Sequence, residues 1–171
     1  MSYWGLHYRP PRLESGEAVA DQVLPGLWVG NVDSLLDREF MRQIQAIVTA
    51  FPRDRVSEER LDACLAGKRY YRVHIEDRVE APLEAHLDKV ADWIAHERCQ
   101  GSAVLIHCFG GHSRSASFAI YYMLKYFPHV FPTVGQALAA LRLSRPSVRP
   151  NAGFLRKLEH AAAVLHSTAL V

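Results

Sequence analysis

The chain has 171 residues, which is enough for one hydrophobic core and too few for two domains of ordinary size. Hydrophobic residues make up 49% and charged residues 22%, and the formal net charge of +2 is too small to indicate a nucleic-acid partner. No apolar run approaches the roughly 20 residues that span a bilayer, and the N-terminus lacks the basic and apolar segments of a signal peptide. We therefore expect a cytoplasmic protein that does not bind nucleic acid or a membrane.

The three cysteines, Cys64, Cys99 and Cys108, show no CxxC spacing and cannot all pair with one another. A disulfide framework or a thiolate-rich zinc site is therefore not expected. This use of cysteine is typical of a reducing intracellular compartment, where one thiol can be kept free for chemistry.

The first part of the chain has little periodicity. Residues 1–20 are expected to form an N-terminal arm of unknown role, followed by one catalytic domain over residues 21–168. Strand-like runs on either side of Pro25-Gly26 predict a short hairpin at a sheet edge. Ser34, with Asp37 three residues later, predicts the N-terminal cap of a helix as a variant of the capping box.

The following segments alternate between strand-like and helix-like patterns. Ala46–Ala50 is a short β-rich run, and a helical turn is expected around Ser57–Leu65. Tyr71–Ile75 alternates like a half-buried strand, whereas the apolar spacing in Leu83–His96 predicts an amphipathic helix. Ala103–Ile106 is entirely apolar, as in a fully buried central strand.

Three helices are predicted after this strand. The first covers about Ser115–Phe127, and the second opens with a capping box of Thr133 and Gln136 and is ended by Pro146. Asn151 is a favourable N-cap for the third. Strands that alternate with helices predict an α/β domain with a central, mostly parallel sheet flanked by helices on both faces.

The loop from His107 to Ser115 connects the predicted central strand to a helix and reads His-Cys-Phe-Gly-Gly-His-Ser-Arg-Ser. In open α/β sheets, ligands bind at the carboxyl ends of the strands. Backbone N–H groups of a tight loop and a helix N-terminus together bind anions, and Gly110 and Gly111 permit the turns that such a loop needs. Arg114 adds a planar guanidinium that can donate to two phosphate oxygens. The sequence therefore predicts a phosphate-binding loop.

Cys108 begins this loop, and it is the candidate nucleophile. A helix N-terminus and a neighbouring cation favour the thiolate form of a cysteine. The alternatives for Cys108 are a buried small apolar residue and a metal site with His107 and His112. The metal site lacks a fourth ligand, and neither a metal nor an organic cofactor is expected.

The sequence His-Cys-x5-Arg-Ser resembles the signature of the cysteine-based protein tyrosine phosphatase superfamily. Leu24–Gly30 resembles the opening Leu-Pro-x-Leu-x-x-Gly of its small dual-specificity phosphatases, and Tyr71–Asp77 resembles the strand that leads to their acid loop. Pro146–Phe154 resembles their Pro-x-x-x-Pro-Asn-x-x-Phe segment. The matches run in the family's order from about Leu24 to Leu165. The chain is thus similar to small, atypical dual-specificity protein phosphatases, which implies a phosphotyrosine protein phosphatase-like fold.

The resemblance implies a role for each matched residue. Cys108 matches the nucleophile, Arg114 the phosphate-binding arginine and Asp77 the general acid. Ser115 matches the hydroxyl that assists breakdown of the phosphocysteine, the alternative being an ordinary residue in the first turn of a helix. The other implied residues are Phe109, Gly110, Gly111, His112 and Ser113, which with Arg114 bind the substrate phosphate, and His107 and Asn151, which support the loop.

Several assignments keep an alternative. Glu76 is the rival for the general acid, and Asn151 would cap its helix whether or not it braces the loop. His112 is either a contact for a second anionic group or a solvated residue at the rim. Phe109 is either a contact for an aromatic substrate or local packing. Where the family often has Asn after its second core strand, this chain reads Val48-Thr49-Ala50-Phe51, which puts one loop-supporting contact in doubt.

The resemblance implies hydrolysis of phosphotyrosine, and of phosphoserine or phosphothreonine, in a phosphorylated protein partner, and it leaves the oligomeric state open. One alternative is a phosphatase of a phosphoinositide or of an RNA 5′ phosphate. Relatives of that type often carry extra basic residues in the loop, where only His112 could serve here. The other alternative is a catalytically silent module that binds phosphorylated partners, against which Cys108, Arg114 and Asp77 argue.

Overall fold

The computed structural model describes residues 12–52 and 58–168, and its centre is one sheet of five strands in the order β1-β2-β5-β3-β4. The strands are β1 (Ala20–Leu24), β2 (Leu27–Gly30), β3 (Ala46–Ala50), β4 (Arg69–Val73) and β5 (Val104–His107). β1 pairs antiparallel with β2 at the edge, and the other neighbours are parallel. The mostly parallel sheet and the edge hairpin are therefore confirmed, and Gly26 turns the hairpin with a φ of 73°.

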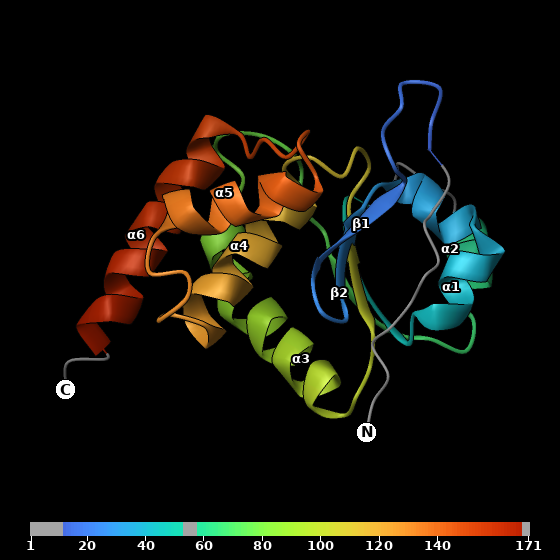
Figure 1. Cartoon of the computed structure of the whole chain (residues 1–171), viewed down its shortest axis with the longest axis horizontal. Helices are drawn as coiled ribbons and strands as arrows, with labels where there is room; N and C mark the ends of the chain where they lie inside the picture. The colour runs from blue at the N-terminus through green and yellow to red at the C-terminus, as the bar shows by residue number, and fades with distance from the viewer. Residues whose placement is uncertain (1–11, 53–57, 169–171) are drawn as a thin grey trace.

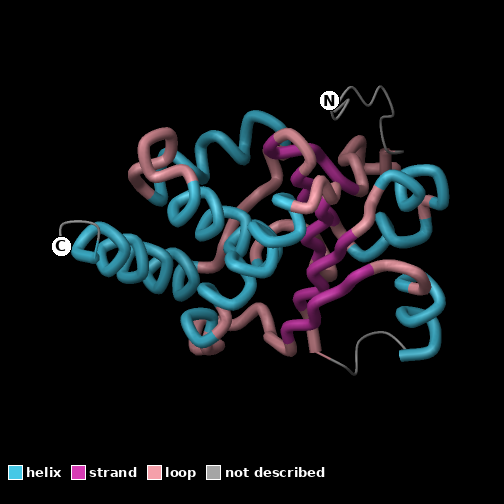
Figure 2. Tube along the Cα trace, turned by 90° about the horizontal axis from the view of Figure 1, so that it is seen from below, coloured by secondary structure: helices cyan, strands magenta, loops and turns pink. Residues whose placement is uncertain are grey.

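Helices cover both faces of the sheet, as predicted (Figures 1 and 2). One face carries the short 3-10 helix η1 (Val32–Leu36), α1 (Arg38–Gln43) and α2 (Glu58–Leu65). The other face carries η3 (Leu83–Ala85), α3 (Leu87–Cys99), α4 (Arg114–Tyr126), α5 (Val134–Ser144) and α6 (Ala152–Thr168). In the described part of the chain, no helix is both long and apolar enough to cross a membrane.

The sheet separates two hydrophobic clusters. Because side chains alternate along a strand, Val104 and Ile106 of β5 pack against α3 and α4, whereas Leu105 between them packs against α1 and α2. All three side chains are fully buried. This burial on both sides fixes the register of β5 and thereby the position of the loop that follows it.

The predicted cap at Ser34 is wrong. Asn31 lies at the start of η1, and the hydroxyl of Ser34 donates to the backbone oxygen of Asn31 over 2.6 Å. Helix α1 begins only at Arg38, where Oδ1 of Asp37 accepts hydrogen bonds from two backbone N–H groups, each at 3.1 Å. Asn31 and Asp37 are both good cap residues, and together they divide the expected single helix into two short ones.

Other predicted boundaries differ by a few residues. β4 ends at Val73, so that Ile75 is buried beyond the strand, and the expected helix over residues 83–96 is divided into η3 and α3. The caps at Thr133 and Asn151 are confirmed, since each side chain accepts a hydrogen bond from the first turn of its helix. Of the expected N-terminal arm, residues 1–11 lie outside the described residues, and β1 begins at Ala20. The domain boundary at residue 21 stays a prediction.

Candidate active site

Cys108 lies directly after β5 and is 2% exposed. Its Sγ atom accepts a hydrogen bond from the backbone N–H of Gly111 at 3.1 Å and lies 3.3 Å from Oγ of Ser115. Its own backbone N–H donates to Gly30 of the neighbouring strand over 3.4 Å. The thiol is therefore held at the base of the loop between β5 and α4, where the carboxyl ends of the parallel strands meet.

The rest of this loop presents unpaired donors. Within the described residues, the backbone N–H groups of Phe109, Gly110, His112 and Ser113 make no hydrogen bond. Helix α4 begins at the next residue, and no side chain caps its N-terminus. Unpaired backbone N–H groups and a helix N-terminus both attract anions, so the predicted phosphate-binding loop has the required donors.

Arg114 is the first residue of α4 and is 9% exposed. Its Nη1 donates to the backbone oxygen of Ile75 over 3.2 Å, and its buried Nε has no partner among the described residues. Arg114 lines a cavity of about 170 Å³. This cavity is lined by Pro52, Glu76, Asp77, Arg78, Phe109 and Arg114. The candidate acid and the candidate phosphate-binding arginine thus share one small cavity at the loop.

Asp77 lies in the loop after β4 and is tied to two other predicted site residues. Its Oδ1 accepts hydrogen bonds from Oγ of Ser113 at 2.7 Å and from Nδ2 of Asn151 at 2.8 Å. Oδ1 of Asn151 caps α6, and its backbone N–H donates to Oγ of Ser113 in the predicted phosphate-binding loop over 3.0 Å. The rival acid, Glu76, lines the same cavity and contacts the exposed Arg78 at 3.4 Å.

His107 is fully buried at the end of β5, opposite Thr49 of β3. Its Nε2 lies 2.8 Å from Oγ1 of Thr49, and its Nδ1 lies 3.3 Å from the backbone oxygen of Cys108. Burial lowers the pKa of His107 to about 4, so the imidazole is neutral at pH 7. His107 therefore supports the backbone of Cys108 without adding a positive charge. Thr49 contacts the loop only through His107 among the bonds that the structure describes.

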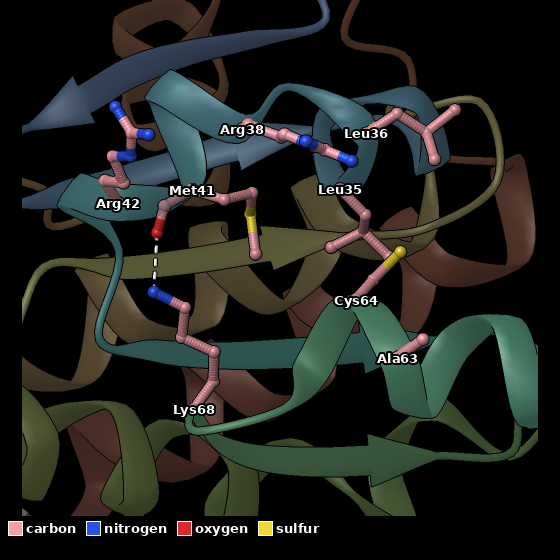
Figure 3. Close-up of a pocket in the computed structure, with 8 residues that line it drawn as sticks. All are labelled: Leu35, Leu36, Arg38, Met41, Arg42, Ala63, Cys64 and Lys68. Atoms are coloured by element: carbon pink, nitrogen blue, oxygen red, sulfur yellow. Dashed lines mark hydrogen bonds between the residues drawn. The ribbon is translucent and has the colours of Figure 1, made fainter.

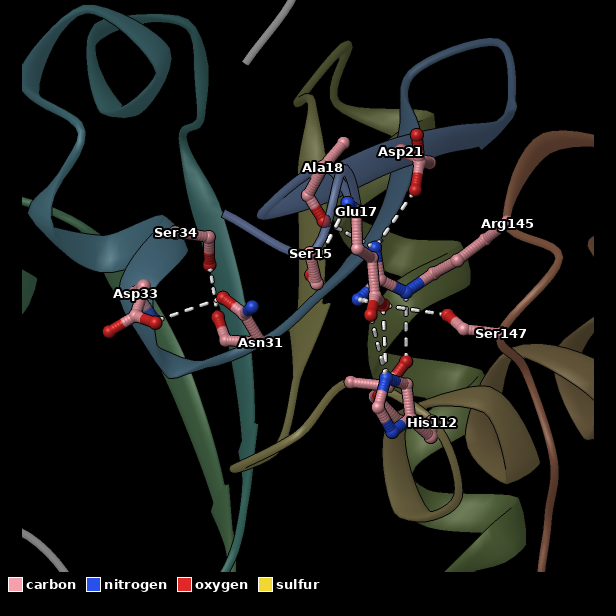
Figure 4. A network of polar contacts seen from close by, with 12 residues as sticks. Ser15, Glu17, Ala18, Asp21, Asn31, Asp33, Ser34, His112, Arg145 and Ser147 are labelled. Atoms are coloured by element: carbon pink, nitrogen blue, oxygen red, sulfur yellow. Dashed lines mark hydrogen bonds and ion pairs between the residues drawn. The ribbon is translucent and has the colours of Figure 1, made fainter. Parts of the chain in front are cut away.

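The side chain of His112 does not line the cavity at Arg114. Its Nε2 lies 2.9 Å from Oε1 of Glu17, a residue that precedes β1 (Figure 4). Its backbone oxygen accepts a hydrogen bond from the backbone N–H of Arg149 at 2.8 Å. The structure thus pairs this side chain with an acidic residue of the chain itself. Binding of phosphate by the backbone N–H of His112 stays a prediction.

Arg145, Glu17 and Asp21 were not expected at the site. Nε of Arg145 donates to the backbone oxygen of Gly111 in the predicted phosphate-binding loop over 2.9 Å, and the carboxylates of Glu17 and Asp21 contact the same guanidinium. An arginine after the last turn of a helix is usually exposed, so no sequence pattern marks this one as buried. Asp21 lies 124 positions before Arg145 in the sequence, and Glu17 lies earlier still, so only the fold brings the three residues together.

A second cavity, of about 520 Å³, lies on the opposite face of the sheet (Figure 3). It is lined by residues of η1, α1 and α2 and by Lys68, whose Nζ donates to the backbone oxygens of Met41 and Ile44. Cys64 is part of its lining, but no predicted site residue is. The three cysteines are free, and within the described ranges no cluster of His, Cys, Asp or Glu is arranged to hold a metal ion. The chemistry is therefore concentrated at the loop after β5.

Comparison with known proteins places this loop in a family. The family model of the dual specificity phosphatase catalytic domain matches residues 27–163. Mouse dual specificity protein phosphatase 15 is 31% identical over 140 residues, which cover 81% of this chain and 55% of that protein. Dual specificity protein phosphatase 1 of Arabidopsis thaliana is 39% identical over 90 residues, or 53% of this chain and 44% of that protein. The chain thus spans about half the length of these curated relatives.

The likeness extends to the fold. The crystal structure of human DUSP28 superposes with a TM-score of 0.77 at 20% sequence identity, covering 93% of this chain and 99% of that one. The family model covers well over half of the chain and includes the loop, Arg114 and the residues after β4. The chain therefore belongs to the dual specificity phosphatase catalytic domain family.

Proposed function

We propose that this protein hydrolyses phosphotyrosine, and also phosphoserine or phosphothreonine, in proteins through a phosphocysteine intermediate. One observation carries the proposal. Sγ of Cys108 lies at the base of a loop in which four backbone N–H groups have no partner within the described residues, beside the buried guanidinium of Arg114. A nucleophile and a set of anion-binding donors thus belong to one short loop. Family membership supports a phosphoric monoester as the anion.

The first step transfers the phosphoryl group to sulfur. The α4 N-terminus and Arg114 bind the phosphate oxygens. The thiolate attacks phosphorus, a sulfur–phosphorus bond forms, and the bond from phosphorus to the substrate oxygen breaks. Asp77 gives a proton to that leaving oxygen, so the dephosphorylated side chain departs as a neutral hydroxyl.

The second step returns the enzyme to its starting state. A water molecule attacks the phosphocysteine, and the Asp77 carboxylate takes up its proton. The sulfur–phosphorus bond breaks, and its electron pair stays on Cys108 as the thiolate. Ser115, whose hydroxyl lies 3.3 Å from Sγ, donates a hydrogen bond to the departing sulfur. The net reaction consumes one water and releases inorganic phosphate.

The substrate class follows from the lining of the cavity. Phe109 is 51% exposed at its rim and offers an apolar face to a tyrosine ring. Apart from Phe109, the cavity of about 170 Å³ is lined by Pro52, Glu76, Asp77, Arg78 and Arg114. None of these is a large apolar side chain that requires an aromatic ring, so we expect an alkyl phosphate of serine or threonine to bind there as well. The three free cysteines fit a reducing compartment, and we propose a cytoplasmic location.

The test compares wild-type protein with Cys108→Ser, using Cys99→Ser as the control because Cys99 is an exposed, free cysteine at the end of α3. We expect the wild type and the control to release phosphate from phosphotyrosine and phosphoserine peptides. Cys108→Ser should have no turnover but still bind the phosphopeptide. Rapid quench and mass spectrometry should find phosphate on Cys108 of the wild type.

Three results would contradict the proposal in different ways. Turnover by Cys108→Ser would exclude the covalent mechanism. A wild type that binds phosphopeptides without hydrolysing them would be a silent binding module. Faster hydrolysis of a phosphoinositide or of an RNA 5′ phosphate than of any phosphopeptide would make the substrate a non-protein ester.

A further inference from the structure

Arg145 is the largest fully buried side chain among the described residues, with an exposed fraction of 0%. A buried guanidinium is strongly destabilising unless its charge and its donors are matched. Its Nη1 donates to the carboxylate of Asp21 and to the backbone oxygen of Ala18, each over 2.8 Å, and its Nη2 lies 2.7 Å from Oε1 of Glu17. Two carboxylates thus share one arginine, and residues at the start of the described chain hold its guanidinium in place (Figure 4).

The fourth contact of Arg145 reaches the phosphate-binding loop. Its Nε donates to the backbone oxygen of Gly111 over 2.9 Å, while the N–H of the same glycine donates to Sγ of Cys108 over 3.1 Å. Because a peptide unit is planar and trans, a Gly111 oxygen that faces Arg145 directs the N–H of His112 to the opposite side. Arg145 therefore sets the direction of one of the unpaired loop donors.

The backbone at Gly111 is packed so closely that residue 111 has no room for a side chain. Its φ is 73°, and a Cβ atom there would lie 2.7 Å from Nη2 of Arg145 and 2.7 Å from the backbone carbon of Gly30. The arginine and the loop are in direct contact at this point. A shift of the guanidinium would therefore be transmitted to the loop backbone.

The acidic partners lie outside the matched family domain. That match begins at residue 27, whereas Glu17 precedes β1 and Asp21 is part of it. Glu17 also accepts a hydrogen bond from Oγ of Ser147 at 2.6 Å and pairs with His112. Burial raises the pKa of Glu17, but the hydrogen bonds of Ser147 and His112 and the charge of Arg145 outweigh it and leave the pKa lowered. Glu17 is thus a carboxylate at neutral pH.

We propose that Glu17 and Asp21, acting through Arg145, are positioning residues that hold the phosphate-binding loop in its anion-binding conformation. The segment that precedes the matched family domain is in this way part of the phosphate site. The inference rests on the proposed phosphatase function for its biological meaning. It concerns the loop itself, however, and is measurable without turnover.

The experiment compares Glu17→Gln and Asp21→Asn with Asp88→Asn. Asp88 is the matched control because it ties α3 to Tyr121 and Lys125 of α4, away from the loop. Three quantities are measured for each full-length protein: the melting temperature, the inhibition constant of vanadate, and the ratio of Cys108 alkylation rates with anionic iodoacetate and neutral iodoacetamide. The alkylation ratio reports anion attraction by the loop, which a loss of fold stability alone would leave unchanged.

We expect Glu17→Gln and Asp21→Asn to weaken vanadate inhibition about tenfold, the size of one lost hydrogen bond to a charged group, and to lower the alkylation ratio. Asp88→Asn should lower the melting temperature and change neither. Ser147→Ala removes one donor to Glu17 and should shift both readouts in the same direction by less, which keeps the test usable if the charge variants fail to fold.

Unchanged vanadate inhibition and alkylation ratio in the folded Glu17, Asp21 and Ser147 variants would overturn the inference, because the cluster would then stabilise the fold alone. A wild type that hydrolyses no phosphopeptide would overturn the proposed function instead. The alkylation ratio would still decide the inference in that case.

Discussion

The Sγ atom of Cys108 and the hydroxyl of Ser115 lie 3.3 Å apart across the turn from β5 into α4, and both side chains are buried. Ser115 belongs to the first turn of the helix, so its hydroxyl is held beside the sulfur by the backbone. A hydroxyl in this position can donate a hydrogen bond to a thiolate. That bond stabilises the thiolate that is the reactant of the first step and the leaving group of the second, so its loss hinders the breakdown of the phosphocysteine and not its formation.

Replacing Ser115 with Ala should therefore slow the second chemical step more than the first. A hydrogen bond to a charged group contributes about 1.5–3 kcal/mol, which corresponds to a loss of roughly 10- to 150-fold in that step. With para-nitrophenyl phosphate, Ser115→Ala should give a burst of product followed by slow turnover. Rapid-quench kinetics measures both phases, and a variant whose kcat falls without a burst would show that Ser115 acts before the intermediate forms.

Arg114→Lys tests whether the guanidinium is needed for its shape as well as its charge. Lysine keeps the positive charge but cannot donate two parallel hydrogen bonds to a phosphate. Turnover and vanadate binding should both weaken by roughly 10- to 100-fold, the range for charge-assisted hydrogen bonds. Arg78→Lys is the matched control, since Arg78 lines the same cavity with an exposed side chain. Equal, small effects in the two variants would mean that any cation suffices at residue 114.

The elements that carry the site could be predicted because their signals are local. Four consecutive apolar residues at Ala103–Ile106 require burial on both sides, and a strand buried in this way is central. The glycines after Cys108 and the cap at Asn151 act on neighbouring backbone. For the same reason, the sequence correctly predicts that a strand, a loop and a helix follow one another here. It also correctly predicts that the loop lies at the carboxyl end of the strand.

The contacts that organise the loop could not be predicted because they join distant segments. Nothing near Arg145 in the sequence indicates that Glu17 and Asp21 will neutralise it, yet this pairing decides that the arginine is buried. The prediction of a helix cap at Ser34 failed for a different reason. Asn31 and Ser34 compete for one helix start, and propensity alone does not separate two good cap residues.

His107 should make the stability of the fold depend on pH. Its pKa is about 4 in the folded protein and near 6.5 when exposed, so the unfolded chain binds the proton more readily. The stability that comes from neutral His107 is fully present above pH 6.5 and is lost as the pH falls toward 4. The slope reaches about 1.4 kcal/mol per pH unit for one such group.

Urea unfolding of the wild type at pH 7 and pH 5 should show this loss. His107→Gln should be less stable at pH 7, because it loses the contact with Thr49, but its stability should fall less toward pH 5. His96→Gln, on the exposed side of α3, is the control that leaves His107 in place. A pH dependence of His107→Gln as steep as that of the wild type would show that other groups cause it.

Asp77 and Glu76 line the same cavity, but their surroundings differ. Both hydrogen bonds to Asp77 are made to Oδ1, from Ser113 and Asn151, which leaves Oδ2 as the oxygen that can carry a proton to the substrate. Glu76 contacts only the exposed Arg78 among the bonds that the structure describes. A positioned acid needs a fixed orientation, so we expect Asp77 to be the proton donor.

The substrate's leaving group decides between the two carboxylates. Positioned proton transfer contributes about 10²–10⁴-fold, and an alkyl or phenolic oxygen needs the proton far more than an activated aryl oxide does. Asp77→Asn should therefore slow hydrolysis of a phosphoserine peptide strongly and that of an activated aryl phosphate much less, whereas Glu76→Gln should affect both slightly. Asn151→Ser keeps an oxygen to cap α6 but removes the donor to Asp77, so it should reproduce the same dependence more weakly at a near-normal melting temperature. If Glu76→Gln alone shows the leaving-group effect, the acid is Glu76, and the hydrogen bonds of Asp77 serve only to join the loop after β4 to α6.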